Sequence, residues 1–242
     1  GVEAWLAAAR DPALATADDP RHQKWLRHRG TWFAGVDVLE NDLEGRVADG
    51  PPLQCAALAE AERIAGNLPL HRAQISITYP GYPQQDAEEG DANHRFRRDR
   101  DAAHLDGVLP MGPDRLRMIR EPHGYILGLP LTANKGEEAP LVVWERSHEV
   151  MRTAMRADLT PFPADHWAEV DVTAAYQAAR RLCFETCKRV EITAQPGEAI
   201  LVHRLALHGV APWLANGGAM QRAIAYFRPE LPGGVQDWLA LD

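Results

Sequence analysis

Polar and apolar residues alternate most clearly in AQISITYPGYP, which begins at Ala73. In residues 74–79 the even positions are polar, whereas the odd positions are Ile, Ile and Tyr. Side chains on a strand point alternately to its two faces, so this pattern predicts a strand with one polar and one apolar face. The Pro-Gly pair that follows predicts the turn that ends the strand.

Further runs that are rich in apolar residues and bounded by turn residues also predict strands. They are GYILGLPLT, APLVVWERSH, KRVEIT, AILVHRLALHGV and RAIAYFRP. The run DAAHLDGVLP predicts one more strand, which carries His104 and Asp106 among small or apolar residues.

Apolar residues at helical spacing, with Pro or Gly at the ends, are concentrated near the N-terminus. They predict helices in VEAWLAAAR, PRHQKWLRHRG and PLQCAALAEAERIAG, and later one helix after Glu149 and one in DVTAAYQAARRLCFETC. TWFAGVDVLENDLEG predicts a short hairpin. The highly charged QQDAEEGDANHRFRRDRD predicts a surface loop.

Together these elements predict a mainly β fold with α: a double-stranded β-helix (a jelly-roll or cupin-like barrel) with an N-terminal helical cover. We expect one domain over residues 1–242. Within it, we expect the cover in 1–70, the core with a helical insertion in 71–228, and a tail in 229–242.

Charge and composition argue against several classes of partner. The 26 basic and 34 acidic side chains give a net charge of −8, which disfavours nucleic acid, since binding it requires cations that neutralise phosphates. Three cysteines, an odd number, do not indicate the disulfide framework of a secreted protein. We find no basic leader and no apolar run of about 20 residues, so we expect a cytoplasmic protein that does not span a membrane.

The chemistry is concentrated around His104 and Asp106. These residues are two positions apart, so on a strand both side chains point to the same side while Leu105 turns away. A metal site there needs a third ligand, and AILVHRLALHGV offers His203 and His208. Two histidines and one carboxylate leave open coordination positions, which is the arrangement of non-haem Fe(II) oxygenases.

Arg222, fourteen positions after His208, is a candidate to hold the distant carboxylate of 2-oxoglutarate. A guanidinium suits this task because it donates two parallel hydrogen bonds to a carboxylate. The Asn-Gly pair between the two residues is a common hairpin signal, so we expect them on neighbouring antiparallel strands.

The segments HLDG, PGEAILVHRLALHG and RAIAYFRP, in this order, resemble the H-x-D, distal His and Arg pattern of the Fe(II)/2-oxoglutarate-dependent dioxygenases. The resemblance is strongest to the phytanoyl-CoA dioxygenase-like family, whose strand ending in a Ser-His turn is similar to APLVVWERSHEVM. It covers roughly residues 71–228. It implies that His104, Asp106 and His208 hold Fe(II) and are the catalytic residues, and that Arg222 binds 2-oxoglutarate.

The resemblance also implies dioxygen as the second cosubstrate. The halogenating members of this superfamily have a small residue in place of the carboxylate, so Asp106 implies hydroxylation or a related oxidation. We add Gln74 and Tyr125 as candidates for cosubstrate binding: if helices cover the apolar face of the first strand, its polar face points into the barrel.

The expected partner is a small molecule whose identity the sequence does not specify. If it is acidic, the candidates to bind it are Arg117, Arg120 and any of the arginines in HRFRRDRD. Two alternatives stay open: a zinc-dependent hydrolase, since three ligands and a water also form a catalytic zinc site, and a non-catalytic cupin-like protein that binds a metal or a small molecule. The oligomeric state is also open.

Overall fold

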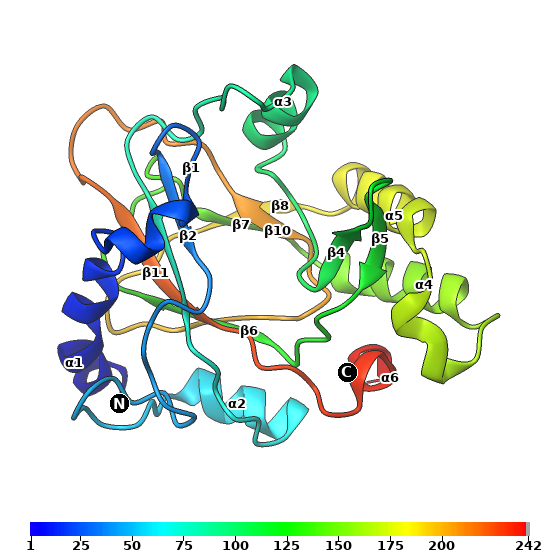
Figure 1. Ribbon diagram of the computed structural model, residues 1–242, viewed down its shortest axis with the longest axis horizontal. Coiled ribbons are helices and arrows are strands. Elements are labelled where there is room, and N and C mark those ends of the chain that lie inside the picture. The colour runs from blue at the N-terminus through cyan, green and yellow to red at the C-terminus, as the bar shows by residue number, and fades with distance from the viewer. Residues whose placement is uncertain (241–242) are drawn as a thin grey trace.

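A six-stranded antiparallel sheet lies at the centre of the molecule (Figure 1). The computed structural model describes residues 1–240. The strand order of this larger sheet is β1-β2-β3-β11-β6-β9. Its strands are β1 Leu26–Arg27, β2 Trp32–Gly35, β3 Gln74–Thr78, β6 Ile126–Pro130, β9 Ile200–Val202 and β11 Arg222–Phe227.

A smaller sheet faces the larger one. It has the order β10-β7-β8, and residues of both sheets line the same cavity. Its strands are β7 Leu141–Trp144, β8 Arg189–Ile192 and β10 His208–Val210. A separate hairpin consists of β4 Val108–Met111 and β5 Leu116–Ile119.

The strand pairing is that of a jelly roll. The His104 segment is joined to β10 by an antiparallel bridge between His104 and His208. Eight segments form the jelly roll, in the chain order β3, the His104 segment, β6, β7, β8, β9, β10 and β11. They pair from the outside inward: β3 with β11, the His104 segment with β10, β6 with β9, and β7 with β8. This arrangement of two facing antiparallel sheets confirms the predicted fold class. Within residues 1–240 the strands form separate sheets and do not close into one ring.

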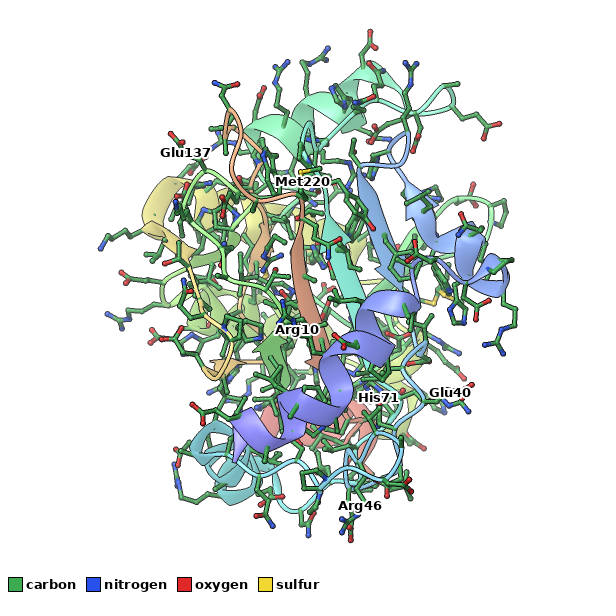
Figure 2. All side chains as sticks on the ribbon, turned by 90° about the vertical axis from the view of Figure 1, so that its left-hand side faces the viewer. Arg10, Glu40, Arg46, His71, Glu137 and Met220 are labelled. Atoms are coloured by element: carbon green, nitrogen blue, oxygen red, sulfur yellow. The ribbon has the colours of Figure 1, made fainter. Side chains whose placement is uncertain are left out.

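The outer face of the larger sheet is covered by the N-terminal helices. Ile75 and Ile77 of β3 are almost fully buried there, in one apolar cluster with residues of α1 Val2–Ala15 and α2 Ala56–Ala65. The ring of Trp5 on α1 makes an edge contact with Phe227, with ring centroids 6.0 Å apart. Figure 2 shows α1, with the labelled Arg10, lying across these strands. The polar face of β3 therefore points inward.

The remaining helices lie around the edges of the sheets. α4 and α5 pack side by side at the end of the molecule where α6 also lies (Figure 1). The helices are η1 Pro20–Trp25, α3 Asp91–Asp99, α4 Ser147–Leu159, η2 Ala164–Glu169, α5 Thr173–Thr186 and α6 Gly234–Ala240, where η marks a 3-10 helix. Within residues 1–240, no helix is both long enough and apolar enough to cross a bilayer.

Several local predictions were wrong. The charged segment predicted to be a loop contains α3, a surface helix without a buried residue. PRHQKWLRHRG forms only the short η1 before β1, and β1 pairs with the start of TWFAGVDVLENDLEG, so the hairpin lies one element earlier than predicted. The predicted cover thus supplies two strands to the larger sheet, and the predicted tail contains α6.

Two predictions about the strands that carry the candidate ligands were also wrong. His104 forms a single bridge instead of belonging to a continuous strand, and a turn at Asp106 follows before β4 begins. His208 and Arg222 do not lie on paired neighbours, because β10 pairs with β7 whereas β11 lies between β3 and β6. The segment with Asn-Gly crosses from one sheet to the other, so the two residues lie on different sheets.

Candidate metal centre

Three side chains that are far apart in the chain converge between the two sheets. His104, Asp106 and His208 each offer one ligand atom, and these atoms all lie within 4.8 Å of one another. The Oδ1 atom of Asp106 is 3.1 Å from Nε2 of His104 and 3.7 Å from Nε2 of His208. The structure thus brings together the three residues that the sequence singled out as ligands.

Backbone hydrogen bonds place the two histidines beside each other. The amide of His104 donates to the carbonyl of His208 at 2.8 Å, and the amide of His208 donates back at 3.1 Å. Their ring centroids are 4.6 Å apart. A third contact supports this segment: the hydroxyl of Ser147, in the Ser-His turn, accepts a hydrogen bond from the amide of Leu207 at 2.8 Å.

Both imidazoles are oriented for ligation through Nε2. Nδ1 of His104 lies 3.1 Å from the carbonyl oxygen of Ala102, and Nδ1 of His208 lies 2.9 Å from that of Ala206. A carbonyl oxygen only accepts hydrogen bonds, so each Nδ1 carries the proton and donates it. This tautomer leaves the lone pair on each Nε2 directed at the carboxylate of Asp106, as metal-binding histidines require.

Two glycines allow the ligand loops to approach other backbone segments. Gly107, directly after Asp106, has a φ of +79°, and a Cβ there would lie 2.0 Å from the carbonyl oxygen of Glu121. At Gly209, directly after His208, a Cβ would lie 2.1 Å from the carbonyl oxygen of Asp101. Any side chain at either position would displace a candidate ligand.

Arg228 holds the second oxygen of the Asp106 carboxylate, and our sequence reasoning missed it. Its Nη1 donates to Oδ2 of Asp106 at 3.1 Å, and its Nη2 donates to the side-chain oxygen of Gln74. The opposite oxygen, Oδ1, is thereby left facing the two histidines. A signal was present in RAIAYFRP, because Arg222, Tyr226 and Arg228 are separated by even numbers of residues and so share one face of an extended chain.

The electrostatic surroundings favour the protonation states that bind a metal. Burial opposes ionisation of Asp106, but the positive charge of Arg228, with smaller effects of the neighbouring His208 and His104, outweighs it and holds the pKa of Asp106 well below its usual range. Burial lowers the pKa of His208 to about 4, although Asp106 acts in the opposite direction. At neutral pH, Asp106 is therefore an anion and His208 is neutral. The side chain of His104 is half exposed, so the centre opens to solvent on that side.

Arg222 is buried on the inner face of β11 with much of its guanidinium unsatisfied. The residue is 2% exposed, and its Nε and Nη1 have no hydrogen-bond partner among residues 1–240. Its Nη2 is 3.4 Å from the hydroxyl of Tyr226, which lines the cavity beside the candidate ligands. Thr78, its register partner on β3, also has a buried hydroxyl without a partner within the described residues. Such groups are costly to bury alone, and a carboxylate would satisfy them.

The structure places the other two candidates for cosubstrate binding differently. Gln74 lines the cavity, where its side-chain oxygen accepts the hydrogen bond from Arg228. Tyr125 is buried in the outer apolar cluster that contains residues of α2, whereas its neighbour Ile126 lines the cavity. Burial, the largest effect, and the carboxyl of Glu62 on α2 raise the pKa of Tyr125. The structure thus does not bring Tyr125 to the candidate centre.

His203, the other histidine considered as a distal ligand, lies elsewhere. Its Nδ1 accepts a hydrogen bond from the amide of Leu205 at 3.0 Å, and its ring lies beside that of His148, with centroids 4.6 Å apart. Burial, the largest effect, and the nearby charge of Arg204 together lower the pKa of His203 to about 3. His203 is therefore a neutral, buried histidine outside the candidate centre.

Two adjoining cavities meet at the candidate ligands. The inner cavity, of about 100 Å³, lies between the sheets, and Trp32, Ile126 and Val202 form much of its apolar wall. The outer cavity, of about 300 Å³, shares His104 and Asp106 with the inner one and extends along the β4–β5 hairpin. The centre thus has a confined inner side and a wider outer side.

Comparison with known proteins yields only distant structural likenesses. No family model matches the chain, and no curated protein matches it. Among solved structures, it is similar to the non-heme alpha-ketoglutarate-dependent carbocyclase SnoK from nogalamycin biosynthesis, with 15% identity and a TM-score of 0.46 over 96% of this chain and 79% of that one.

The chain is also similar to AviO1 from Streptomyces viridochromogenes Tue57, with 18% identity and a TM-score of 0.43 over 96% of this chain and 86% of that one. EctD from S. alaskensis, in its apoform, has 16% identity and a TM-score of 0.45 over 95% of this chain and 72% of that one. At such low identities and TM-scores, these likenesses carry no weight for the chemistry of this chain.

Proposed function

We propose that this protein is a non-haem Fe(II)- and 2-oxoglutarate-dependent dioxygenase that hydroxylates a small molecule. One observation supports this most directly. Three ligand atoms suited to Fe(II) converge at a cavity between the sheets, and a buried arginine with unpartnered donors lies on the same inner face.

The residues fit the metal and the cosubstrate. His104, Asp106 and His208 offer two neutral nitrogens and one carboxylate oxygen, the donor set of non-haem Fe(II) oxygenases with open coordination positions. Arg222 and Thr78 offer unpartnered buried donors, which suit the distant carboxylate of 2-oxoglutarate.

Fe(II), 2-oxoglutarate and dioxygen together supply an oxidation that replaces a C–H bond of the substrate by C–OH and yields succinate and carbon dioxide. The chain contributes position and surroundings. Arg228 fixes the carboxylate of Asp106 so that Oδ1 remains directed at the metal position. Trp32 and Ile126 give the inner cavity an apolar wall, which disfavours water beside the reacting groups.

The two alternatives make different use of the same residues. A zinc hydrolase needs three ligands and a water, which this centre also offers, but it has no use for the unpartnered donors of Arg222. A non-catalytic binding protein would bind the metal and a small molecule without turnover. The hydrolase alternative therefore leaves the unpartnered donors of the register partners Arg222 and Thr78 unexplained.

A titration followed by a turnover assay tests the proposal. Without oxygen, 2-oxoglutarate should bind to the protein loaded with Fe(II) and bind much more weakly to the metal-free protein. Once oxygen is admitted with ascorbate, succinate should form. Arg222→Gln should abolish tight binding, whereas Arg63→Gln, which alters an exposed arginine paired with Glu60 on α2, should bind as the wild type does.

Each alternative predicts a distinct result. Zinc-dependent hydrolysis of esters or amides without 2-oxoglutarate binding would identify the hydrolase. Metal binding without either reaction would support the binding protein. In both cases the dioxygenase proposal would be wrong.

A further inference from the structure

We infer that the substrate is a small organic anion, with a carboxylate or phosphate group, and that Arg117 binds this group in the outer cavity. The role of this anion as the substrate rests on the proposed function. The anion site itself follows from charges and contacts around Arg117 that do not involve the metal.

Arg117 lines the same cavity as two of the candidate metal ligands. It lies on β5, paired with Pro110 on β4, and it borders the outer cavity together with His104 and Asp106. Its Nη1 donates to the carbonyl oxygen of Val108 at 3.2 Å. This bond anchors the half-buried side chain to the hairpin that follows the candidate metal ligands.

The other charged residues of the outer cavity already have partners. Arg97 pairs with Glu89 at 3.2 Å, and Arg228 pairs with Asp106 at 3.1 Å. The carboxylate of Asp101 is bound by Arg189 at 2.7 Å, and that of Glu121 lies 3.3 Å from Nε2 of His123. Arg117 has no carboxylate within ion-pair distance among residues 1–240.

A second arginine without a carboxylate partner in residues 1–240 contacts the same aromatic ring as Arg117. The guanidinium of Arg180 lies 4.5 Å from the ring centre of Phe96 and 5.3 Å from that of Tyr176, and its buried Nε has no partner in the described part of the chain. The guanidinium of Arg117 is 5.7 Å from the ring centre of the same Tyr176. The two guanidinium groups therefore approach one aromatic ring without a carboxylate partner for either in residues 1–240.

This environment disfavours the positive charge of Arg117 in the absence of an anion. Burial, the largest effect, lowers the pKa of Arg117 below its ordinary value; Tyr176 acts in the opposite direction, and the charges of Arg180 and Arg115 add smaller lowering effects. An anion in the cavity would compensate this charge by charge-assisted hydrogen bonds, which are stronger than neutral ones. In a protein with net charge −8, anions are attracted only where a positive charge is left unpaired, as that of Arg117 is on the wall of this cavity.

The rest of the cavity limits the size of the ligand. Its volume of about 300 Å³ suits a small molecule, and Trp32, Val108 and Leu109 give it apolar walls. A ligand with its charged group on Arg117 would place an apolar or hydroxylated body along these walls, toward the side that His104 and Asp106 share.

Calorimetric titration with matched pairs of probes tests the inference. The pairs are glycerol 3-phosphate with glycerol, and hexanoate with hexanamide. They are titrated into the wild type loaded with Fe(II) and saturated with 2-oxoglutarate without oxygen, so that 2-oxoglutarate occupies the inner site. The two pairs also distinguish phosphate from carboxylate as the preferred group.

We expect at least one anion to bind about tenfold more tightly than its neutral partner. Arg117→Gln should weaken that binding by about tenfold, and Arg117→Lys should retain most of it because the charge remains. Arg120→Gln is the matched control, since Arg120 is exposed and its Nη1 donates to the carbonyl of Ala168 outside the cavity. It should bind as the wild type does.

Equal binding of charged and neutral partners, or unchanged binding by a folded Arg117→Gln, would overturn the inference. If Arg117→Gln does not fold, the wild type must show the preference for anions together with a loss of affinity at high salt, and the absence of either overturns it. The same titrations on metal-free protein separate the two hypotheses. Anion binding that depends on Arg117, without any turnover of 2-oxoglutarate, would retain the anion site and remove the proposed function.

Discussion

The two faces of β3 and β11 have opposite properties, although successive residues of the same strands supply both. Ala73, which adjoins β3, continues the outer face, and Arg228, which adjoins β11, continues the inner face. On the outer face, the side chains are apolar and fully packed against the N-terminal helices. They are Ala73, Ile75, Ile77, Ala223, Ala225 and Phe227. On the inner face, the side chains are mostly polar, and several have unpartnered atoms. They are Gln74, Ser76, Thr78, Arg222, Ile224, Tyr226 and Arg228.

This difference separates stability from function within one sheet. Burial of the outer side chains stabilises the fold through the hydrophobic effect, at roughly 25 cal/mol per Å² of apolar surface. A buried guanidinium with unpartnered donors, such as Nε and Nη1 of Arg222, destabilises the fold until a ligand satisfies them. The inner face therefore depends on the outer face for its stability, and its own groups are available for binding.

The largest effect should come from loss of a candidate metal ligand. His208→Ala should abolish metal binding and reduce turnover on the order of a thousandfold, because two ligands remain where three converge. Metal titration followed by calorimetry and succinate formation measure both effects. Tight Fe(II) binding by this variant would show that the metal lies elsewhere.

A second large effect should come from the unpartnered arginine on the inner face. Arg222→Met should weaken 2-oxoglutarate binding about a hundredfold, because a buried charge-assisted contact is lost. Its free energy of unfolding should not fall, since the removed charge has no carboxylate partner among residues 1–240. Chemical denaturation and 2-oxoglutarate titration of the same sample separate the two quantities. A strongly destabilised variant would contradict this assignment.

A moderate effect should follow from changing the partnered arginine on the same strand. Arg228→Gln removes the ion pair to Asp106, so we expect metal affinity to fall about tenfold, and the affinity for 2-oxoglutarate measured at saturating metal to change less. Comparison with Arg222→Met provides the control, because that variant should show the opposite balance. If both variants weaken the same ligand equally, the two arginines do not have separate roles.

The smallest effect should come from the outer face. Ile77→Val removes one methylene from a side chain that is 1% exposed, and we expect a loss of about 1 kcal/mol in the free energy of unfolding. Metal and 2-oxoglutarate affinities should stay within about twofold of the wild type. A change in either affinity would show that the two faces are coupled.

The local patterns identified many of the elements, because they depend on residues that are close in sequence. The alternation in residues 74–78 predicts β3 and its two faces. The spacing of His104 and Asp106 predicts that their side chains lie on one side, and they do approach each other, although through a bridge and a turn and not on one strand. The same rule puts Arg228 on one face with Arg222, but no local feature indicated that its partner would be Asp106, 122 positions away. We also proposed Tyr125 as a cosubstrate-binding residue, but it is Ile126, the next residue along the chain, that lines the cavity.

The charged segment that includes α3 shows a different limit. Its residues suggest a solvated loop, and the structure places them on the surface as expected, but as a helix whose charges pair with one another and with the preceding loop. Composition thus predicted the exposure of this segment and not its backbone conformation. Helix formation there depends on local hydrogen bonds that polarity does not report.

The sequence alone determined which side chains share a strand face and which residue types are available to hold a metal. It also determined that the chain forms strands with one polar and one apolar face, together with helices that can cover the apolar face. Only the tertiary structure decided that His208 and Arg222 lie on different sheets, that Arg228 holds Asp106, and that Arg117 has no carboxylate partner in residues 1–240. The physical reason is that side-chain direction along a strand follows from neighbouring residues, whereas pairing between distant segments follows from how the two sheets pack.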